Sequence, residues 1–383
     1  MLIIIVLGVL CVKILILMTH PAPYRIIFFK ELSKYVDLTV MYEAENYKGI
    51  DSREWNIDKN KKTYKEIYLT KSKKINGDFI NSLGVLKIID DSYDCVIVMA
   101  HGTLCSKIAI MYMRLLKIPY VLNIDGVLPY VMEKESKIKY FMKKIFYNGA
   151  DMYITTGKQS VKYLEHYSIN NKIIKFYHFT SVYDDDVLSK IITEEEKVIK
   201  KKLLNIDKKM ILYVGRVISI KGIDALLNVA KLLSCNHDIE FYVIGGNMDD
   251  KYKHIIKNNY YKNVRFIPYM NKTALDKYYE AADVFFLPTE QDTWGLVINE
   301  AMAKGLPVVT TENCGAGMEM VENNKNGFIV KVNDALDMAD KIKKIMENDE
   351  LRENMKKYSL SIAKNFTLEN MIQDHLKFFN ISN

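Results

Sequence analysis

The chain has few cysteines, and they stand far apart in its 383 residues. They are odd in number, and no two form a Cys-x-x-Cys pair; the five are Cys11, Cys95, Cys105, Cys235 and Cys314. This pattern argues against a disulfide framework and predicts reduced core residues of a cytosolic protein. The seven histidines also lack the spacing of a ligand set, and we expect no bound metal.

A long apolar run is missing as well. The first apolar segment, MLIIIVLGVLCV, comprises residues 1–12 and is followed by Lys13. It is short of the roughly 20 residues that span a bilayer, and it lacks the basic start and small-residue cleavage site of a signal peptide. We therefore expect residues 1–12 to be an interfacial anchor or an unimportant extension rather than a spanning helix.

The net charge of +7 comes without a basic-aromatic module, so we expect no nucleic-acid partner. The charge suits an anionic membrane surface or an acidic lipid-linked acceptor. Lysines in the segment from Lys134 to Phe146 stand opposite an apolar face of Ile138, Phe141, Met142 and Ile145. Such a helix either binds an anionic lipid surface or packs on a sheet, and both interpretations stay open. We expect a cytoplasmic protein at the inner face of the plasma membrane.

Strands and helices alternate in both halves of the chain. The length exceeds what one core usually supports, so the pattern predicts two doubly wound α/β units. The strands that we expect are residues 13–18, 95–99, 119–124, 150–155, 210–214, 241–244 and 284–287.

The segment from Pro288 to Thr311, PTEQDTWGLVINEAMAKGLPVVTT, joins two acidic residues to a strand, a glycine turn and a helix. Asp292 is expected in the loop after the buried strand, and Glu300 about one turn into the helix. A loop that enters a helix from the carboxyl end of a parallel strand presents free N–H groups and a positive dipole end, which suits phosphate. Carboxylates beside that phosphate would accept hydrogen bonds from ribose and sugar hydroxyls. Spacing alone is equally compatible with a surface carboxylate and a helix cap.

Two other strand ends carry similar turns. Gly215, Arg216 and Lys221 follow the strand at 210–214, and Gly245 follows the strand at 241–244. Since parallel strands end at the same edge of a sheet, these junctions predict one phosphate-binding edge.

The motifs YVGRVISIKGIDALL, AADVFFLP, DTWGLVINEAMAKGLPVVTT and GFIV, in this order, resemble the carboxyl domain of the retaining glycosyltransferases of family 4, also called group 1. The resemblance covers half of the chain and implies an α/β GT-B fold, in which two doubly wound Rossmann-like domains face each other across a cleft. It implies that Arg216 and Lys221 bind the donor diphosphate, that Glu300 binds the ribose, and that Asp292 binds the transferred sugar. The donor-binding set is completed by Gly215, Gly245, Trp294, Gly295 and Leu296.

The resemblance also implies a domain plan. We expect an acceptor domain at 1–182, a linker with an acidic stretch and an entry helix at 183–209, a donor domain at 210–369, and a final helix at 370–383 that returns to the first domain.

Two positions depart from the family. It usually has Glu at the first acidic position, and the shorter Asp292 would let the sugar sit slightly deeper. Asp125, in YVLNIDG, stands where relatives often carry His, so it is a candidate to orient the acceptor hydroxyl or the sugar O6. His20 and His101, in loops after predicted strands, are the other candidates, and each is equally compatible with a loop residue bonded to backbone.

The hypothesis from the sequence is a retaining, metal-independent hexosyltransferase. It would move a hexose or N-acetylhexosamine from a nucleotide-diphosphate sugar, with UDP expected, to a lipid-linked glycan in bacterial surface polysaccharide synthesis. No cofactor is expected beyond the nucleotide sugar. Two alternatives stay open: a sugar-nucleotide 2-epimerase of the same fold, and a noncatalytic nucleotide-sugar-binding partner.

Overall fold

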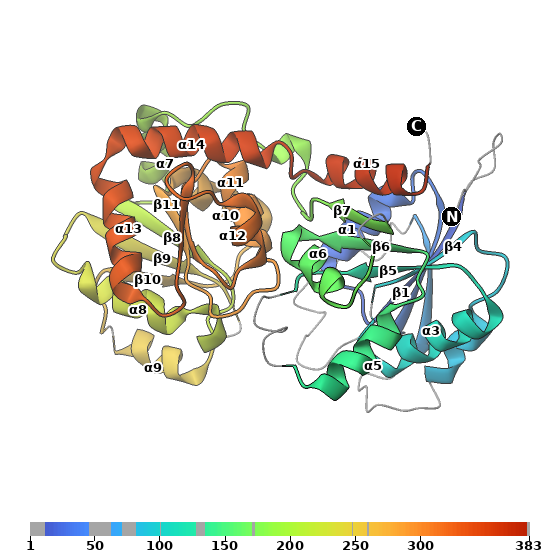
Figure 1. The fold of residues 1–383 in the computed structure, drawn as a ribbon. Helices are drawn as coiled ribbons and strands as arrows, with labels where there is room; N and C mark the ends of the chain where they lie inside the picture. The colour runs from blue at the N-terminus through green and yellow to red at the C-terminus, as the bar shows by residue number, and fades with distance from the viewer. Residues whose placement is uncertain are drawn as a thin grey trace. The chain divides into compact units, whose positions relative to one another are not determined.

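A computed structural model describes residues 12–45, 63–70, 82–99, 101–127, 135–170, 173–246, 248–258 and 260–380. The chain forms two compact units, residues 1–181 with 368–383, and residues 182–367 (Figure 1). The expected anchor at residues 1–12, apart from Val12, lies outside the described residues, as does Cys11.

The first unit is a parallel sheet covered by helices on both faces. Its strand order is β3-β2-β1-β4-β5-β6-β7. Helices α3, α5 and α6 share one apolar core with the sheet, whereas α15 packs on α1 and β7. The elements are β1 (Lys13–Met18), α1 (Pro23–Leu32), β2 (Asp37–Ala44), β3 (Lys65–Thr70), β4 (Cys95–Val98), α3 (Leu104–Leu116), β5 (Tyr120–Ile124), α5 (Lys137–Tyr147), β6 (Met152–Thr156), α6 (Gly157–His166), β7 (Ile174–Tyr177) and α15 (Leu368–Phe378).

The second unit is a parallel sheet with the order β10-β9-β8-β11-β12-β13. Figure 1 shows α8 and α13 on one side of this sheet and α10 and α11 on the other. The elements are α7 (Glu194–Leu203), β8 (Lys209–Val214), α8 (Ile223–Leu232), β9 (Ile239–Ile244), α9 (Asp250–Lys257), β10 (Val264–Ile267), α10 (Lys272–Ala281), β11 (Val284–Leu287), α11 (Leu296–Ala303), β12 (Val308–Thr311), α12 (Gly315–Met320), β13 (Gly327–Val330), α13 (Ala335–Glu347) and α14 (Asp349–Ala363).

In each sheet the chain starts in the middle, builds one side, and then returns to build the other. The reversal falls between β1 and β4 in the first unit and between β8 and β11 in the second. Loops that leave the carboxyl ends of the strands at such a reversal diverge to opposite faces of the sheet and leave room for a ligand. The fold therefore singles out the loops after β8 and β11.

The central strands are apolar throughout because both of their faces are covered. All four residues of β11 are buried, as are five of the six residues of β8. Continuous apolar runs are expected for strands enclosed between two helix layers. The two doubly wound α/β units predicted from the sequence are confirmed, and each of the seven predicted strands is present with small shifts at its ends.

The segment at 183–209, expected as a linker with an acidic stretch and an entry helix, lies in the second unit, where α7 packs against α10. Two expectations need correction. Cys235 is exposed, whereas Cys95, Cys105 and Cys314 are buried free thiols. The packed-helix interpretation of residues 134–146 is wrong for its apolar face, because Ile138 and its apolar neighbours on α5 are exposed. In the described part of the chain, every helix is too short or too polar to cross a bilayer.

A buried carboxylate fixes the start of β11. Asp283 accepts hydrogen bonds from the backbone N–H of Met210 at 2.7 Å, from Lys197 at 3.0 Å and from Lys201 at 2.5 Å. Its own N–H donates to the Met210 carbonyl at 2.9 Å. Asp283 therefore sets the register between β8 and β11 and holds α7 on the unit. Burial alone would raise the pKa of Asp283, but the two lysines and the Met210 N–H outweigh it and lower this pKa to about 2.

Replacing Asp283 by Asn should destabilise the protein by about 3 kcal/mol or more, because it leaves Lys197 buried without its main counter-charge. The folded-state pKa lies below the ordinary value of 3.8, so the carboxylate stabilises the fold fully above pH 4 and loses this effect as the pH falls toward 2. Urea unfolding at pH 7, 4 and 3 measures both effects.

The matched control is Asp340→Asn, which removes an exposed carboxylate paired with Lys341. It should change the free energy of unfolding by less than about 0.5 kcal/mol. Equal effects of the two substitutions would contradict the role of Asp283.

Candidate active site

The loops after β8 and β11 touch each other through their backbones. Three donors converge on the carbonyl of Ile220: the N–H groups of Glu290 at 3.0 Å and Gln291 at 3.3 Å, and the Thr289 hydroxyl at 3.1 Å. Gly222 makes this approach possible, since a Cβ at that position would lie 1.8 Å from the Pro288 carbonyl oxygen. Its φ of +78° also favours glycine. The loops after β8 and β11 therefore form one continuous surface, which we call the wall of the site.

Two of the predicted donor residues meet at this wall. Lys221 forms an ion pair with Asp292 at 2.7 Å and donates to the Gln291 carbonyl at 3.1 Å. Both side chains keep part of their surface exposed, at 15% and 20%. The ion pair is therefore reached by solvent. A phosphate could compete for Lys221, and a sugar hydroxyl could compete for Asp292.

Arg216 lies on the same edge and is exposed. Within the described ranges, its guanidinium forms no hydrogen bond or ion pair, while its carbonyl accepts from the buried Tyr213 hydroxyl at 2.8 Å. Behind it, the β8 and β9 turns approach closely, since a Cβ on Gly245 would lie 1.8 Å from the Gly215 carbonyl oxygen. The turn is therefore fixed through its backbone, and the cation remains available to an anion.

Helix α11 starts at the same wall. Gly295 precedes it with a φ of +92°, and Leu296 is its first residue. The first N–H groups of any helix lack partners within the helix and carry a partial positive charge. Trp294 packs beneath this turn: its side chain is buried, and its Nε1 donates a hydrogen bond to the Asn299 side chain at 3.0 Å. The Trp294 side chain therefore positions α11.

Glu300 lies one turn further along α11. It accepts a hydrogen bond from the buried Tyr279 hydroxyl of α10 at 2.8 Å. The residue keeps some exposed surface, but the loss of water around its carboxyl raises the pKa of Glu300 to about 7, against the opposing effect of the Tyr279 hydrogen bond. Glu300 thus changes charge near neutral pH. The sequence offered no signal for Tyr279, because a tyrosine in an amphipathic helix is most simply a core residue.

In the first unit, His20 and His101 follow β1 and β4, the two strands at the reversal. His20 is hydrogen-bonded through Nδ1 to the Thr19 hydroxyl at 2.8 Å. The Nδ1 atom of His101 is buried and has no partner among the described residues. Burial lowers the pKa of His20, and it lowers the pKa of His101 to about 4. Burial thus favours the neutral form of both imidazoles and makes each a weaker base than an ordinary histidine.

Asp125 has a different environment. Its carboxylate pairs with the buried Arg25 and accepts from the Tyr177 hydroxyl at 2.7 Å and from the Asn123 amide at 2.6 Å. Both of its oxygens are engaged, so Asp125 links β5, β7 and α1. Neither Arg25 nor Tyr177 was identified from the sequence, because their distance from Asp125 along the chain hides the contact.

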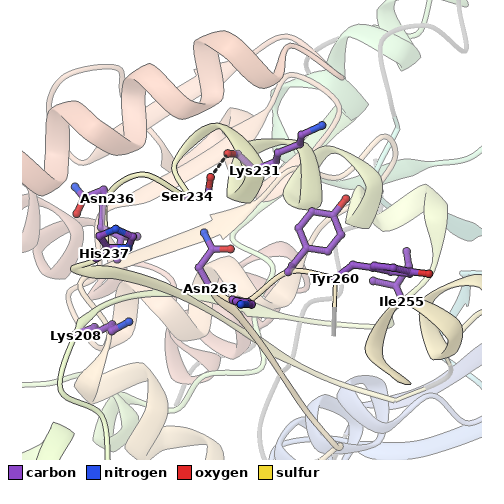
Figure 2. A pocket seen from close by; sticks show the side chains of 11 residues that line it. Lys208, Lys231, Ser234, Asn236, His237, Ile255, Tyr260 and Asn263 are labelled. Carbon is purple, nitrogen blue, oxygen red and sulfur yellow. Dashed lines mark hydrogen bonds between the residues drawn. The ribbon is translucent and has the colours of Figure 1, made fainter. Parts of the chain in front are cut away.

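A surface pocket of about 620 Å³ lies elsewhere on the second unit, as Figure 2 shows. It is lined by the residues next to the amino ends of β8, β9 and β10, among them Lys208, His237 and Asn263. Parallel α/β sheets bind ligands at the carboxyl ends of their strands, which is the opposite edge. We therefore do not assign this pocket to the donor, despite its size.

The described residues contain no group of three or more His, Cys, Asp and Glu side chains that could hold a metal ion. The expected acidic stretch at Asp184–Asp186 forms a short 3-10 turn, and Asp186 pairs with Lys272 at 2.6 Å. The positive groups at the carboxyl edge of the second unit include Arg216, Lys221 and the first turn of α11.

Comparison with known proteins places these features in a family context. Residues 194–361 match the family model of glycosyl transferases, group 1. An uncharacterized glycosyltransferase of Haemophilus influenzae is 32% identical over 179 residues, which cover 46% of this chain and 50% of that protein. The capsular polysaccharide biosynthesis glycosyltransferase CapM of Staphylococcus aureus is 34% identical over 160 residues, or 40% of each chain. These relatives are therefore matched over half of their length or less.

The whole chain resembles solved GT-B structures. The crystal structure of Anabaena Alr3699/HepE in complex with UDP aligns with a TM-score of 0.76 and 16% identity, and the alignment covers 96% of this chain and 99% of that one. At this level of identity the likeness shows the fold, which is GT-B.

Replacing Gly222 by Ala should destabilise the protein by more than about 2 kcal/mol, because the new methyl group meets the Pro288 carbonyl in a left-handed backbone conformation. Gly102→Ala is the control, since a Cβ there has no neighbour within 4 Å, and its effect should stay within about 1 kcal/mol. Urea unfolding measures both. A tolerated Gly222→Ala would show that the two loops do not touch as described.

Proposed function

We propose that the chain is a retaining glycosyltransferase that uses a nucleotide-diphosphate sugar as its donor. UDP is the expected nucleotide, the transferred group is a hexose or N-acetylhexosamine, and the acceptor is a lipid-linked glycan of a bacterial surface polysaccharide. The observation that carries the proposal is the ion pair of Lys221 and Asp292 at the strand-order reversal of a unit that matches the group 1 model. The exposed Arg216 lies on the same edge of the sheet. The capsular relative supports the acceptor class.

The proposed mechanism starts from the charge that must be stabilised. Breaking the bond between the anomeric carbon and the diphosphate places negative charge on the leaving phosphate. Arg216, Lys221 and the first-turn N–H groups of α11 would stabilise it, so the proposal needs no metal ion. Diphosphate binding would separate Lys221 from Asp292 and free that carboxylate for a sugar hydroxyl.

Glu300 would bind the ribose of the donor nucleotide. An ionised Glu300 accepts two hydrogen bonds from a ribose, while Tyr279 fixes its orientation. Attack from the face of the departing phosphate needs no enzyme nucleophile, because that phosphate can take the acceptor proton. His20 and His101 remain the candidates on the acceptor side, and the partners of Asp125 favour a positioning role for it.

Arg216→Ala should lower the transfer rate by about a hundredfold to a thousandfold, the usual effect of losing one group that stabilises developing negative charge. The melting temperature should not change, because the Arg216 side chain is exposed. Nucleotide release from UDP-, GDP-, CMP- and dTDP-sugars, with and without extracted lipid acceptors, measures activity and identifies the donor.

The control is Lys231→Ala, which removes an exposed cation at the pocket of Figure 2 and should leave transfer unchanged. Full activity of the Arg216 variant would remove the assigned donor site. Conversion of the donor without any acceptor would indicate an epimerase, and binding without turnover would indicate a noncatalytic partner.

A further inference from the structure

Helix α5 presents its apolar face outward. Ile138, Phe141, Met142 and Ile145 are exposed at 76%, 61%, 67% and 70%. Their spacing of three and four residues places them on one side of the helix. An amphipathic helix of a globular protein normally turns this side to the core, so α5 is inverted in this respect.

The opposite side of α5 is firmly held. Tyr147 is buried in the core of the first unit, and Tyr140 stacks on Tyr167 with ring centroids 5.4 Å apart. Lys143 pairs with the Glu135 carboxylate at 2.7 Å. Because these contacts fix how the helix is turned about its axis, the exposed apolar side is a consequence of the packing.

Helix α3 extends the same surface. Arg114 of α3 donates to the carbonyls of Ile145 at 2.9 Å and Phe146 at 2.7 Å, which ties the carboxyl ends of the two helices together. Met111 and Leu115 of α3 are exposed at 67% and 80%. We define the α3–α5 face by six of the most exposed apolar residues of these helices: Met111, Leu115, Ile138, Phe141, Met142 and Ile145.

The charged residues of α3 and α5 themselves are all basic. Neither α3 nor α5 contains an Asp or a Glu. Exposed lysines neighbour the apolar residues along the chain: Lys107 in α3, Lys117 directly after α3, and Lys137 and Lys139 in α5. An apolar stripe flanked by lysines matches the boundary between lipid headgroups and acyl chains, where the stripe enters the boundary and the lysines meet lipid phosphates.

We propose that the α3–α5 face binds the surface of a bilayer that contains anionic phospholipids. A second copy of the chain does not suit this face, because pairing two such faces would bring the lysines of α3 and α5 together, and neither helix carries an acidic residue to offset them. This inference rests on the proposed function and extends it. A lipid-linked acceptor would be located in the same bilayer that the α3–α5 face binds.

The test measures co-sedimentation of the full chain with vesicles, in the absence of donor and acceptor. Its failure is thereby distinguishable from failure of the proposed transfer reaction. Vesicles of phosphatidylcholine alone are compared with vesicles that also contain phosphatidylglycerol. The wild type should bind the anionic vesicles at least about tenfold more tightly, and added salt should reduce this preference.

Two double variants divide the face into its apolar and charged parts. Phe141→Gln with Ile145→Gln, and Lys137→Glu with Lys139→Glu, should each weaken binding at least about tenfold. The apolar control is Leu203→Gln with Leu336→Gln, which replaces leucines exposed at 79% and 72% in the second unit. The charge control is Lys277→Glu with Lys357→Glu, on α10 and α14. Both controls should bind like the wild type.

All variants keep residues 1–12, so any binding by that apolar segment is the same in each. Unchanged binding of both face variants would overturn the proposal, as would equal binding of the wild type to neutral and anionic vesicles. Sedimentation velocity of the protein without vesicles tests whether a second copy of the chain occupies the face instead. A concentration-dependent dimer that the Phe141 and Ile145 substitutions abolish would assign the face to a second copy and overturn the proposal.

Discussion

At the amino end of β11, one buried carboxylate holds three elements together. Asp283 receives the Met210 N–H, Lys197 and Lys201, and so it connects β8, β11 and α7. A buried charge is tolerated only when its partners are in place, so these elements must assemble in one register. The register between β8 and β11 also decides which residues of the loops at the carboxyl ends of these strands come together. The geometry of the candidate site therefore depends on this register.

At these carboxyl ends, the backbone segments after the strands approach so closely that two positions require glycine. Gly222 lies against Pro288 of the loop after β11, and Gly245 of the turn after β9 lies against Gly215. The close approach brings Lys221 to Asp292, while Arg216 stays exposed beside them. A cluster of positive groups next to acceptor oxygens, at a strand-order reversal, is the environment that a nucleotide diphosphate with its sugar requires. The proposed chemistry thus follows from the topology of the sheet and from very few side chains.

Much of this could be predicted from the sequence. Continuous apolar runs such as Val284–Leu287 and the glycine turns that follow them are local signals, and they predicted the fold class and the loops that carry the candidate site. Contacts between distant residues left no such signal. The hydrogen bond from Tyr279 to Glu300 and the network of Arg25, Tyr177 and Asp125 form only when separate helices and strands pack. The direction of the apolar face of α5 was equally hidden, because its spacing is the same whether the face turns inward or outward.

The proposed function depends on donor binding at the carboxyl edge of the second unit. Hydrogen–deuterium exchange, measured with and without a saturating nucleoside diphosphate (UDP, GDP and dTDP in turn), would locate the bound nucleotide. One nucleotide should slow exchange in residues 215–222 and 290–297, the loops after β8 and β11. Protection in residues 231–239 and 260–263 instead, around the pocket of Figure 2, would contradict it.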